Sequence, residues 1–95
     1  MLGGKMVKQG WQRSRRATAE DLARTIEEFL DGTGRPWDWD DFTQGGSFED
    51  DRLERIRLRC AGLSEEFPTN EKGHYCSDEG LRVLRSMVTD LRQMR

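Results

Sequence analysis

Residues 18–32, which read TAEDLARTIEEFLDG, carry the pattern that decides the fold class. Their apolar residues recur at the i, i+4, i+7 and i+8 spacing of an amphipathic helix: Leu22, Ile26, Phe29 and Leu30. Thr18 is suited to cap the N-terminus, with Asp21 completing a capping box. Gly32 stands where a left-handed residue commonly ends a helix. The stretch predicts a helix over residues 18–31.

Two further stretches show the same apolar period. The first is residues 48–63, with Ser47 as the expected cap and an inward face made of Leu53, Ile56, Cys60 and Leu63. The second begins after Ser77 and carries a broad apolar arc made of Leu81, Leu84, Met87, Val88, Leu91 and Met94. Helices joined by connections of this length pack as a bundle. We therefore predict an all-α fold, a compact bundle of three main helices.

The composition agrees with one small domain. The chain has 95 residues, of which 34% are hydrophobic and 36% are charged. No apolar run approaches the roughly 20 residues that cross a bilayer, and no apolar segment of a secretory signal stands at the N-terminus. We expect a cytoplasmic protein that does not enter a membrane. Residues 1–16 lack an apolar period and are predicted to form a flexible basic arm, and residues 17–95 a single helical domain.

The charge is distributed unevenly along the chain. The formal net charge is −2. Residues 1–19 carry five bases and no acid, whereas residues 20–51 carry eleven acids and two arginines, a net charge of −9. The middle of the chain is therefore the unusual part, since a segment of one sign attracts a partner of the other.

Residues 34–47, which read GRPWDWDDFTQGGS, lie inside this acidic segment. Trp37 and Trp39 alternate with aspartates, as in a short strand, yet no partner strand is available to satisfy the backbone. The alternative, which we prefer, is an ordered loop with one helical turn over about residues 38–42. Its tryptophans have two interpretations: they fill the core of a small bundle, or at least one is exposed for binding.

Residues suited to catalysis or metal binding are few. His74, Cys76 and the distant Cys60 do not form the two close pairs of a structural zinc site. No orienting group or oxyanion-hole pattern accompanies His74 and Cys76 as a nucleophile pair. The aspartates after Asp38 fail the calcium-loop order, because Phe42 and Thr43 stand where a carboxylate and a glycine are required. We predict no enzyme activity, no metal and no cofactor, and expect both thiols to be reduced.

Basic residues suggest a second possible function. Arg13, Arg15 and Arg16 adjoin Trp11, and Arg52, Arg55 and Arg59 form a stripe on the second predicted helix, which are residue types that bind nucleic acid. The sequence pI of about 5.4 argues against this interpretation. The arginine stripe is also explained by ion pairs within the molecule, with the acids of the first helix or of the tryptophan segment. Nucleic-acid binding therefore remains the alternative.

Protein binding is the function that the sequence favours. Aromatic rings anchor many interfaces, and acidic residues between them would steer a basic partner. The predicted partner-binding residues lie in the tryptophan segment and on the first helix: Trp37, Asp38, Trp39, Asp40, Asp41, Glu27, Glu28 and Asp31. The predicted molecule is a small protein-interaction module.

Two resemblances bear on this prediction. The run from Gly34 to Phe42, together with the loop from Gly73 to Cys76, resembles a family of small uncharacterised bacterial proteins, over about residues 18–93. That resemblance implies no particular activity. In size and acidic helical layout the chain is also similar to immunity proteins that neutralise colicin-type nuclease toxins. The similarity implies an acidic surface that imitates nucleic acid and fills a basic active site, although the arginine stripe departs from it.

Overall fold

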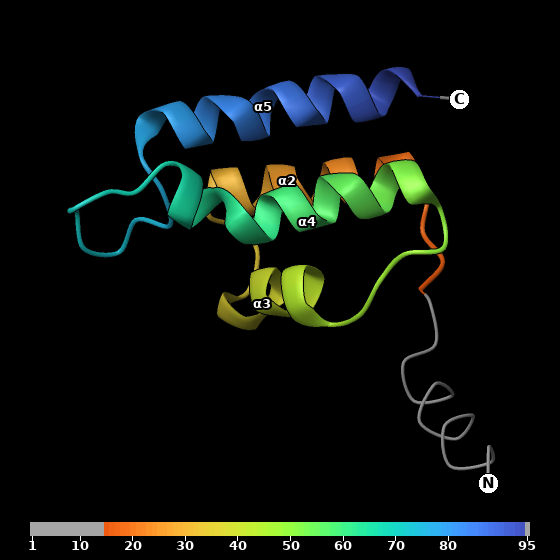
Figure 1. The fold of residues 1–95 in the computed structure, drawn as a ribbon, viewed down its shortest axis with the longest axis horizontal. Coiled ribbons are helices and arrows are strands. Elements are labelled where there is room, and N and C mark those ends of the chain that lie inside the picture. The colour runs from red at the N-terminus through yellow and green to blue at the C-terminus, as the bar shows by residue number, and fades with distance from the viewer. Residues whose placement is uncertain (1–14, 95) are drawn as a thin grey trace, which may run out of the picture.

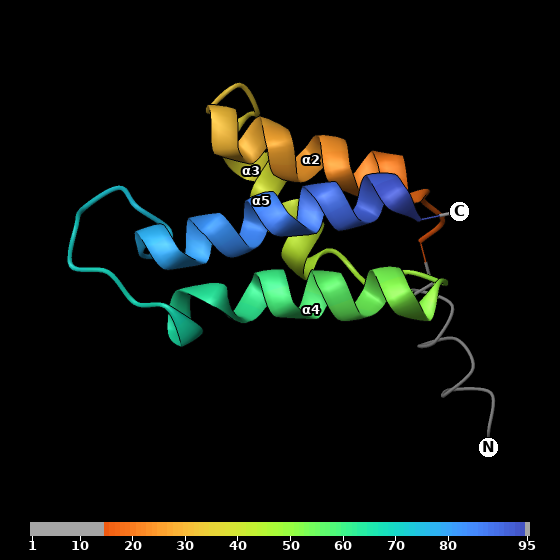
Figure 2. The same cartoon turned by 90° about the horizontal axis from the view of Figure 1, so that it is seen from above.

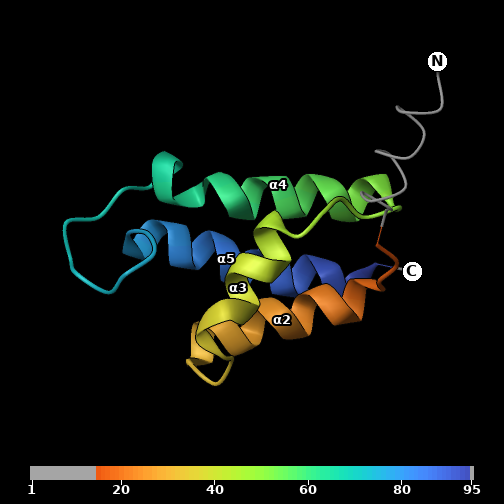
Figure 3. The same ribbon diagram turned by 90° about the horizontal axis from the view of Figure 1, so that it is seen from below.

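The computed structural model describes residues 15–94, apart from the side chains of residues 36 and 37. This part of the chain forms four helices: α2 (Ala19–Asp31), α3 (Pro36–Gln44), α4 (Asp51–Glu66) and α5 (Asp78–Gln93). The three longer helices lie side by side, with α5 antiparallel to α2 and α4 (Figure 1, Figure 2). The short α3 crosses α2 and α4 on the face opposite α5 (Figure 3). The predicted all-α bundle is confirmed.

The ends of α2 follow the local signals of the sequence. The Thr18 side chain accepts a hydrogen bond from the Asp21 amide at 3.1 Å, and the Asp21 carboxylate accepts one from the Thr18 amide at 2.9 Å. Gly32 ends the helix with φ 73° and ψ 17°, a left-handed conformation that costs glycine little. These contacts explain why α2 begins and ends where the sequence predicts.

The tryptophan segment does add a short extra helix to the three main helices, but it is nine residues long rather than a loop or a single turn. Pro36 opens α3, where its missing N–H costs nothing, and the Asp38 carboxylate accepts a hydrogen bond from the Arg35 amide at 3.0 Å. Trp39, Phe42 and Thr43 recur at i, i+3 and i+4, and all three are buried. The alternation of Trp and Asp therefore concealed a helical face.

The other helices differ from expectation at their boundaries. The α4 helix is capped by Asp50, whose side chain accepts a hydrogen bond from the Arg52 amide at 2.8 Å, so Ser47 is not the cap. It also extends beyond residue 63 to Glu66. The α5 helix begins after Ser77, as predicted, although the Ser77 side chain makes no capping hydrogen bond.

One core joins the four helices. The α2 and α5 helices are closely packed, and α3 closes the opposite side of the core over α2 and α4. The buried residues come from all four helices and from Phe48: Leu22, Ala23, Ile26, Trp39, Phe42, Phe48, Leu53, Cys60, Leu63, Leu84, Met87 and Leu91. Within residues 15–94, no helix combines the length and the apolar character required to cross a membrane.

Only the last two residues of the predicted basic arm, Arg15 and Arg16, belong to the described part of the chain. Residues 1–14 of that arm lie outside the described part of the chain. The Arg15 amide donates to the Ser47 carbonyl at 2.7 Å, and the Glu49 amide donates to the Arg15 carbonyl at 2.9 Å. Arg16 forms an exposed ion pair with Glu49 at 3.3 Å. Residues 15 and 16 are therefore attached to the helical body.

Candidate functional site

The most distinctive surface feature is a groove between α2 and α3. It consists of two adjoining hollows of about 220 Å³ and about 240 Å³. Thr25 and Glu28 on α2 and Asp38 on α3 line both of them. We call these two hollows together the α2–α3 groove. It joins the C-terminal end of α2 to the region of Arg15 and Phe48.

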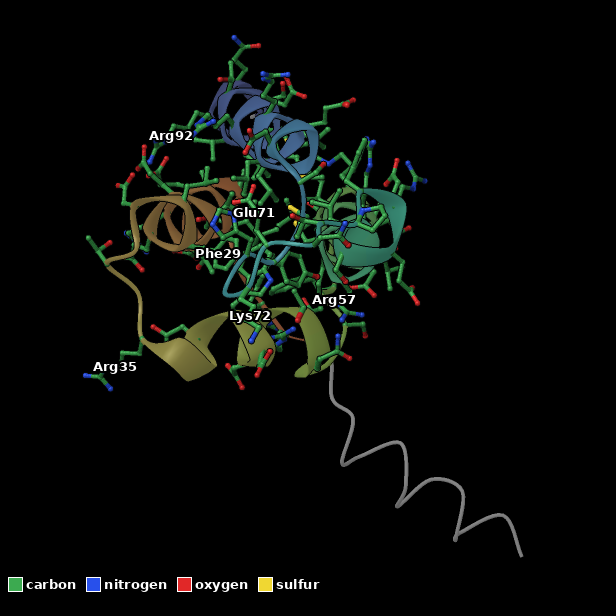
Figure 4. All side chains as sticks on the ribbon, turned by 90° about the vertical axis from the view of Figure 1, so that its left-hand side faces the viewer. Phe29, Arg35, Arg57, Glu71, Lys72 and Arg92 are labelled. Atoms are coloured by element: carbon green, nitrogen blue, oxygen red, sulfur yellow. The ribbon has the colours of Figure 1, made fainter. Side chains whose placement is uncertain are left out.

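The floor of the groove is aromatic and rigid. In the first hollow the rings of Phe29 and Trp39 are stacked, with centroids 4.0 Å apart and an interplanar angle of 15°. Tyr75 packs edge-on against both rings at 5.7 Å. Phe42 and Phe48 line the second hollow. Figure 4 shows Phe29 directed from α2 into the space above α3. A partner side chain would therefore meet a preformed apolar surface.

The walls of the groove are acidic. Glu28 is exposed on α2, and the half-buried Asp38 faces it from α3. The two side chains are close together, because a Cβ added to Gly34 would lie 3.6 Å from the Glu28 Cβ and 3.8 Å from the Asp38 Oδ2. Asp40 and Asp41 are exposed farther along α3, where they line a shallow depression.

Most of these carboxylates lack a counter-ion among the described residues. No ion pair within residues 15–94 involves Glu28, Asp40 or Asp41. Asp38 uses one oxygen for the Arg35 amide. The Arg15 guanidinium lies near Asp41 and donates to its backbone carbonyl at 3.1 Å, so Asp41 is the least available of the acids. Arg35 lines the first hollow and extends outward from the turn before α3 (Figure 4).

The predicted tryptophans have different outcomes. Trp39 is only 7% exposed and forms the floor of the groove, so it cannot serve as an exposed anchor. Its buried indole N–H has no hydrogen bond of good geometry to any residue between 15 and 94. Trp37 belongs to α3, but its side chain lies outside the described part. Core filling, one of the two interpretations of the sequence, is correct for Trp39.

The predicted acidic residues divide between two faces of α2. Glu28 faces α3, together with Asp38 and the acids that follow it. Glu27 faces α5 and pairs with Arg92 at 2.9 Å, beside the Arg92–Glu20 pair at 3.1 Å. Hydrogen bonds from Arg92 lower the pKa of Glu20 and of Glu27. Asp31 lines a separate hollow with Arg85 on the α5 side. Glu27 and Asp31 are therefore not part of the α2–α3 groove.

The arginine stripe of α4 is largely paired within the molecule. Arg52 binds Asp50 at 2.9 Å, and Arg59 binds Glu66 at 3.1 Å. The hydrogen bonds from Arg52 lower the pKa of Asp50 to about 2. Pairing within the molecule was correctly predicted for these two arginines, but their partners are on or beside α4 rather than on α2 or α3. Arg55 is exposed and forms no ion pair with the described residues.

Two arginines that hold the groove in place were not recognised from the sequence. Arg15 donates to the backbone carbonyls of Phe42 at 2.8 Å and Gly46 at 3.1 Å, and its guanidinium lies 4.4 Å from the centre of the Phe48 ring. Arg57 is buried on α4, where it donates to the Thr43 carbonyl and to Glu54. Arg57 follows Leu53 by four residues on the core stripe, and this spacing was the signal that could have identified it.

The groups considered for chemistry lie in different environments. Burial raises the pKa of the Cys60 thiol to about 12 and also raises that of Cys76. Both cysteines are free and buried, whereas His74 is exposed, with its Nε2 3.5 Å from Glu71. Within the described residues, no group of three or more histidine, cysteine or acidic side chains is placed to hold a metal ion.

Comparison with known proteins gave no match: no family model, no curated protein and no solved structure is similar to the chain at a significant level. The two resemblances described for the sequence therefore stay predictions. The geometry of the α2–α3 groove is the basis for the functional proposal.

Proposed function

We propose that the chain is a small protein-interaction module that binds a positively charged partner protein through the α2–α3 groove. The acidic outer face of α3 extends the contact. In the form suggested by the similarity to immunity proteins, the bound module would inhibit its partner by covering a basic site. This proposal keeps Glu28, Asp38, Asp40 and Asp41 as binding residues and leaves out Glu27 and Asp31.

The observation that carries the proposal is the placement of unpaired acids beside an apolar floor. Elsewhere many acids have an assigned structural role: Glu20 and Glu27 bind Arg92, and Glu54 binds Arg57. Asp51, Asp78 and Glu79 lie in first helical turns, where the helix dipole favours negative charge. Glu28 and Asp40 have neither role. Neither makes an ion pair within residues 15–94. Glu28 lies beside the aromatic floor, the kind of surface that interface anchors use, and Asp40 lies on the neighbouring outer face of α3.

Nucleic-acid binding is less well supported. Arg15 and Arg57 are occupied by backbone carbonyls, and Arg16, Arg52 and Arg59 bind carboxylates. A phosphate backbone would have to displace these internal partners, and the acids of the groove would repel it. We therefore keep it as the alternative.

Reversing charge in the groove tests the proposal. The variant Glu28→Lys/Asp40→Lys changes two exposed residues, and Glu65→Lys/Asp90→Lys makes the same charge change on exposed positions of α4 and α5. The partner is captured from a native-cell lysate by cross-linking, identified by mass spectrometry and purified. Its Kd for each variant is then measured by calorimetry at low and high salt.

We expect the groove variant to bind at least about tenfold more weakly, because each reversal replaces attraction by repulsion. The α4/α5 variant should stay within about threefold of the original chain, since distant surface charges contribute little. Circular dichroism and urea unfolding establish that both variants are folded. Unchanged binding by the groove variant, or equal loss in both variants, would contradict the proposal.

A further inference from the structure

We propose that the first hollow of the α2–α3 groove receives one apolar side chain of the partner, and that basic residues adjacent to it in the partner sequence pair with Glu28 and Asp38. This inference rests on the proposed function and names the segment recognised. The partner would present a short basic segment with a central leucine-like residue. It would not bind through a broad positive surface alone.

The size of the hollow favours a single side chain. Its volume is about 220 Å³, which is below the range of about 300 to 1,000 Å³ typical of small-molecule sites. Phe29 and Trp39 line it, and their stacking with Tyr75 at the edge leaves the rings little freedom to move. A side chain that enters meets an ordered apolar surface, the setting in which interface anchors are most effective.

The mouth of the hollow has the features that a flanking basic residue requires. Gly32 and Gly34 line it without side chains, so the backbone of a partner can approach. Glu28 and Asp38 stand together beside Gly34, and with Arg35 in the same lining the hollow keeps one excess negative charge. A basic residue next to the anchor would place its charge between these two carboxylates, while its methylene groups cover the apolar rim. The combination selects an apolar residue with a basic neighbour.

A substitution at Gly34 separates the apolar contact of the anchor from the charge contact with Glu28 and Asp38. Its φ does not lie in the left-handed region, and a Cβ there would make ordinary contacts at 3.6 and 3.8 Å. Gly34→Val should therefore be accommodated, while its methyl groups occupy the mouth between Glu28 and Asp38. The acidic charge of the groove stays unchanged. This variant blocks the anchor, whereas Glu28→Lys/Asp40→Lys reverses the charge of one wall of the hollow and of the neighbouring outer face of α3.

The probes are three synthetic peptides: acetyl-GARRLRRAG-amide, the same peptide with a central alanine, and the leucine peptide with every arginine replaced by glutamate. Binding to the full chain and to each variant is followed by calorimetry and by ¹H–¹⁵N spectra. The Trp39 indole N–H, assigned with Trp39→Phe, reports directly on the floor of the hollow.

We expect the leucine peptide to bind at least about tenfold more tightly than the alanine peptide, the gain expected from burying a leucine side chain. The Trp39 indole resonance should shift only with the leucine peptide, and the glutamate peptide should not bind. In Gly34→Val the two basic peptides should bind within about twofold of each other. In Glu28→Lys/Asp40→Lys both should weaken.

Three outcomes would overturn the inference. If leucine and alanine peptides bind equally, the groove attracts charge without an anchor, and the proposed function stands while the inference fails. If Gly34→Val keeps the leucine preference, the anchor lies elsewhere. If Lys5→Gln/Lys8→Gln/Arg13→Gln in the full chain strengthens leucine-peptide binding by about tenfold or more, the chain's own basic segment is the occupant. If the captured partner binds Glu28→Lys/Asp40→Lys as tightly as the original chain, the proposed function itself is refuted.

Discussion

Arg57 occupies a position of α4 that the helical period assigns to the core. Its side chain reaches the Glu54 carboxylate with two hydrogen bonds of 2.8 and 2.6 Å and also donates to the Thr43 carbonyl. It is 9% exposed. Because a buried charge is tolerated only with such partners, this arginine connects α4 to the C-terminal end of α3.

Arg57→Met should destabilise the protein by about 3 kcal/mol. The change leaves the Thr43 carbonyl without its donor and Glu54 without its counter-charge, which is the costly way to break a buried pair. The measurement is the free energy of unfolding in urea. Arg59→Met removes an exposed ion pair with Glu66 and is the matched control, expected to change stability by less than about 1 kcal/mol. Similar effects of the two substitutions would contradict this account.

The same pair determines part of the response to acid. Hydrogen bonds from Arg57 lower the pKa of Glu54 in the folded protein below its ordinary value of 4.5. A lowered pKa adds stability that is fully present above the unfolded value and disappears as the pH falls through the folded value. Urea unfolding at pH 7, 5 and 3 should show a smaller loss of stability between pH 5 and 3 in Arg57→Met than in the original chain.

At the scale of the elements, α2 and α3 show how far the sequence alone can be used. The apolar period, the capping box and the left-handed glycine of α2 all depend on residues within or next to the helix, so the sequence shows all three. The α3 helix depends on distant residues, because Arg15 and Arg57 bind the carbonyls of its last turn. No local pattern shows which carbonyls a remote arginine will reach, so the segment resembled a loop.

The candidate site divides in the same way. The sequence showed the acids and the aromatic residues. Glu28 and Asp38 line the α2–α3 groove, and Asp40 lines the neighbouring depression together with Asp38. The structure places Glu27 and Asp31 outside the groove, because one residue along a helix turns the side chain by about 100°, and Asp31, one turn after Glu27, shares its side of α2. Glu27 therefore faces α5 while Glu28 faces α3. The direction of α3 across the bundle decided which acids could meet.

The role of Arg15 in α3 leads to a prediction about local opening of that helix. Arg15→Met removes hydrogen bonds to the carbonyls of Asp41, Phe42 and Gly46. Charge-assisted hydrogen bonds of this kind are worth about 1.5 to 3 kcal/mol each when buried, and less where water can replace them. We expect hydrogen exchange at the amides of residues 41–45 to accelerate about tenfold or more, with the centre of α5 unchanged.

Arg16→Met is the control for this measurement, because Arg16 is exposed and, among the described residues, forms an ion pair with Glu49 alone. It should leave exchange in α3 unchanged. If Arg15→Met accelerates exchange equally in α3 and α5, then α3 does not open separately, and the arginine stabilises the whole domain rather than one element.

At the scale of the whole molecule, the α4–α5 connection is closed by a contact that only glycine permits. Gly80 lies in the first turn of α5 and is buried against the end of α4. A Cβ at this position would lie 2.6 Å from the Cys76 Sγ, 3.0 Å from the Cys76 Cβ and 3.1 Å from the Phe67 Cβ. The Ser77 amide also donates to the Phe67 carbonyl at 2.8 Å, so the connection is fixed where α5 begins.

Gly80→Ala should therefore destabilise the protein by about 2 kcal/mol, since overpacking outweighs the helical preference for alanine. Gly62→Ala is the opposite control: residue 62 lies within α4 with open space where a Cβ would stand, and the substitution should stabilise by up to about 1 kcal/mol.

Adding Cys76→Ala to Gly80→Ala removes the nearest clashing atom, so the double variant should be more stable than the sum of the two single effects predicts. Urea unfolding of the original chain, Gly80→Ala, Cys76→Ala and the double variant measures this coupling. Strict additivity would mean that Cys76 is not what excludes a side chain at residue 80, and that the approach of α5 to α4 is limited by Phe67 and the backbone.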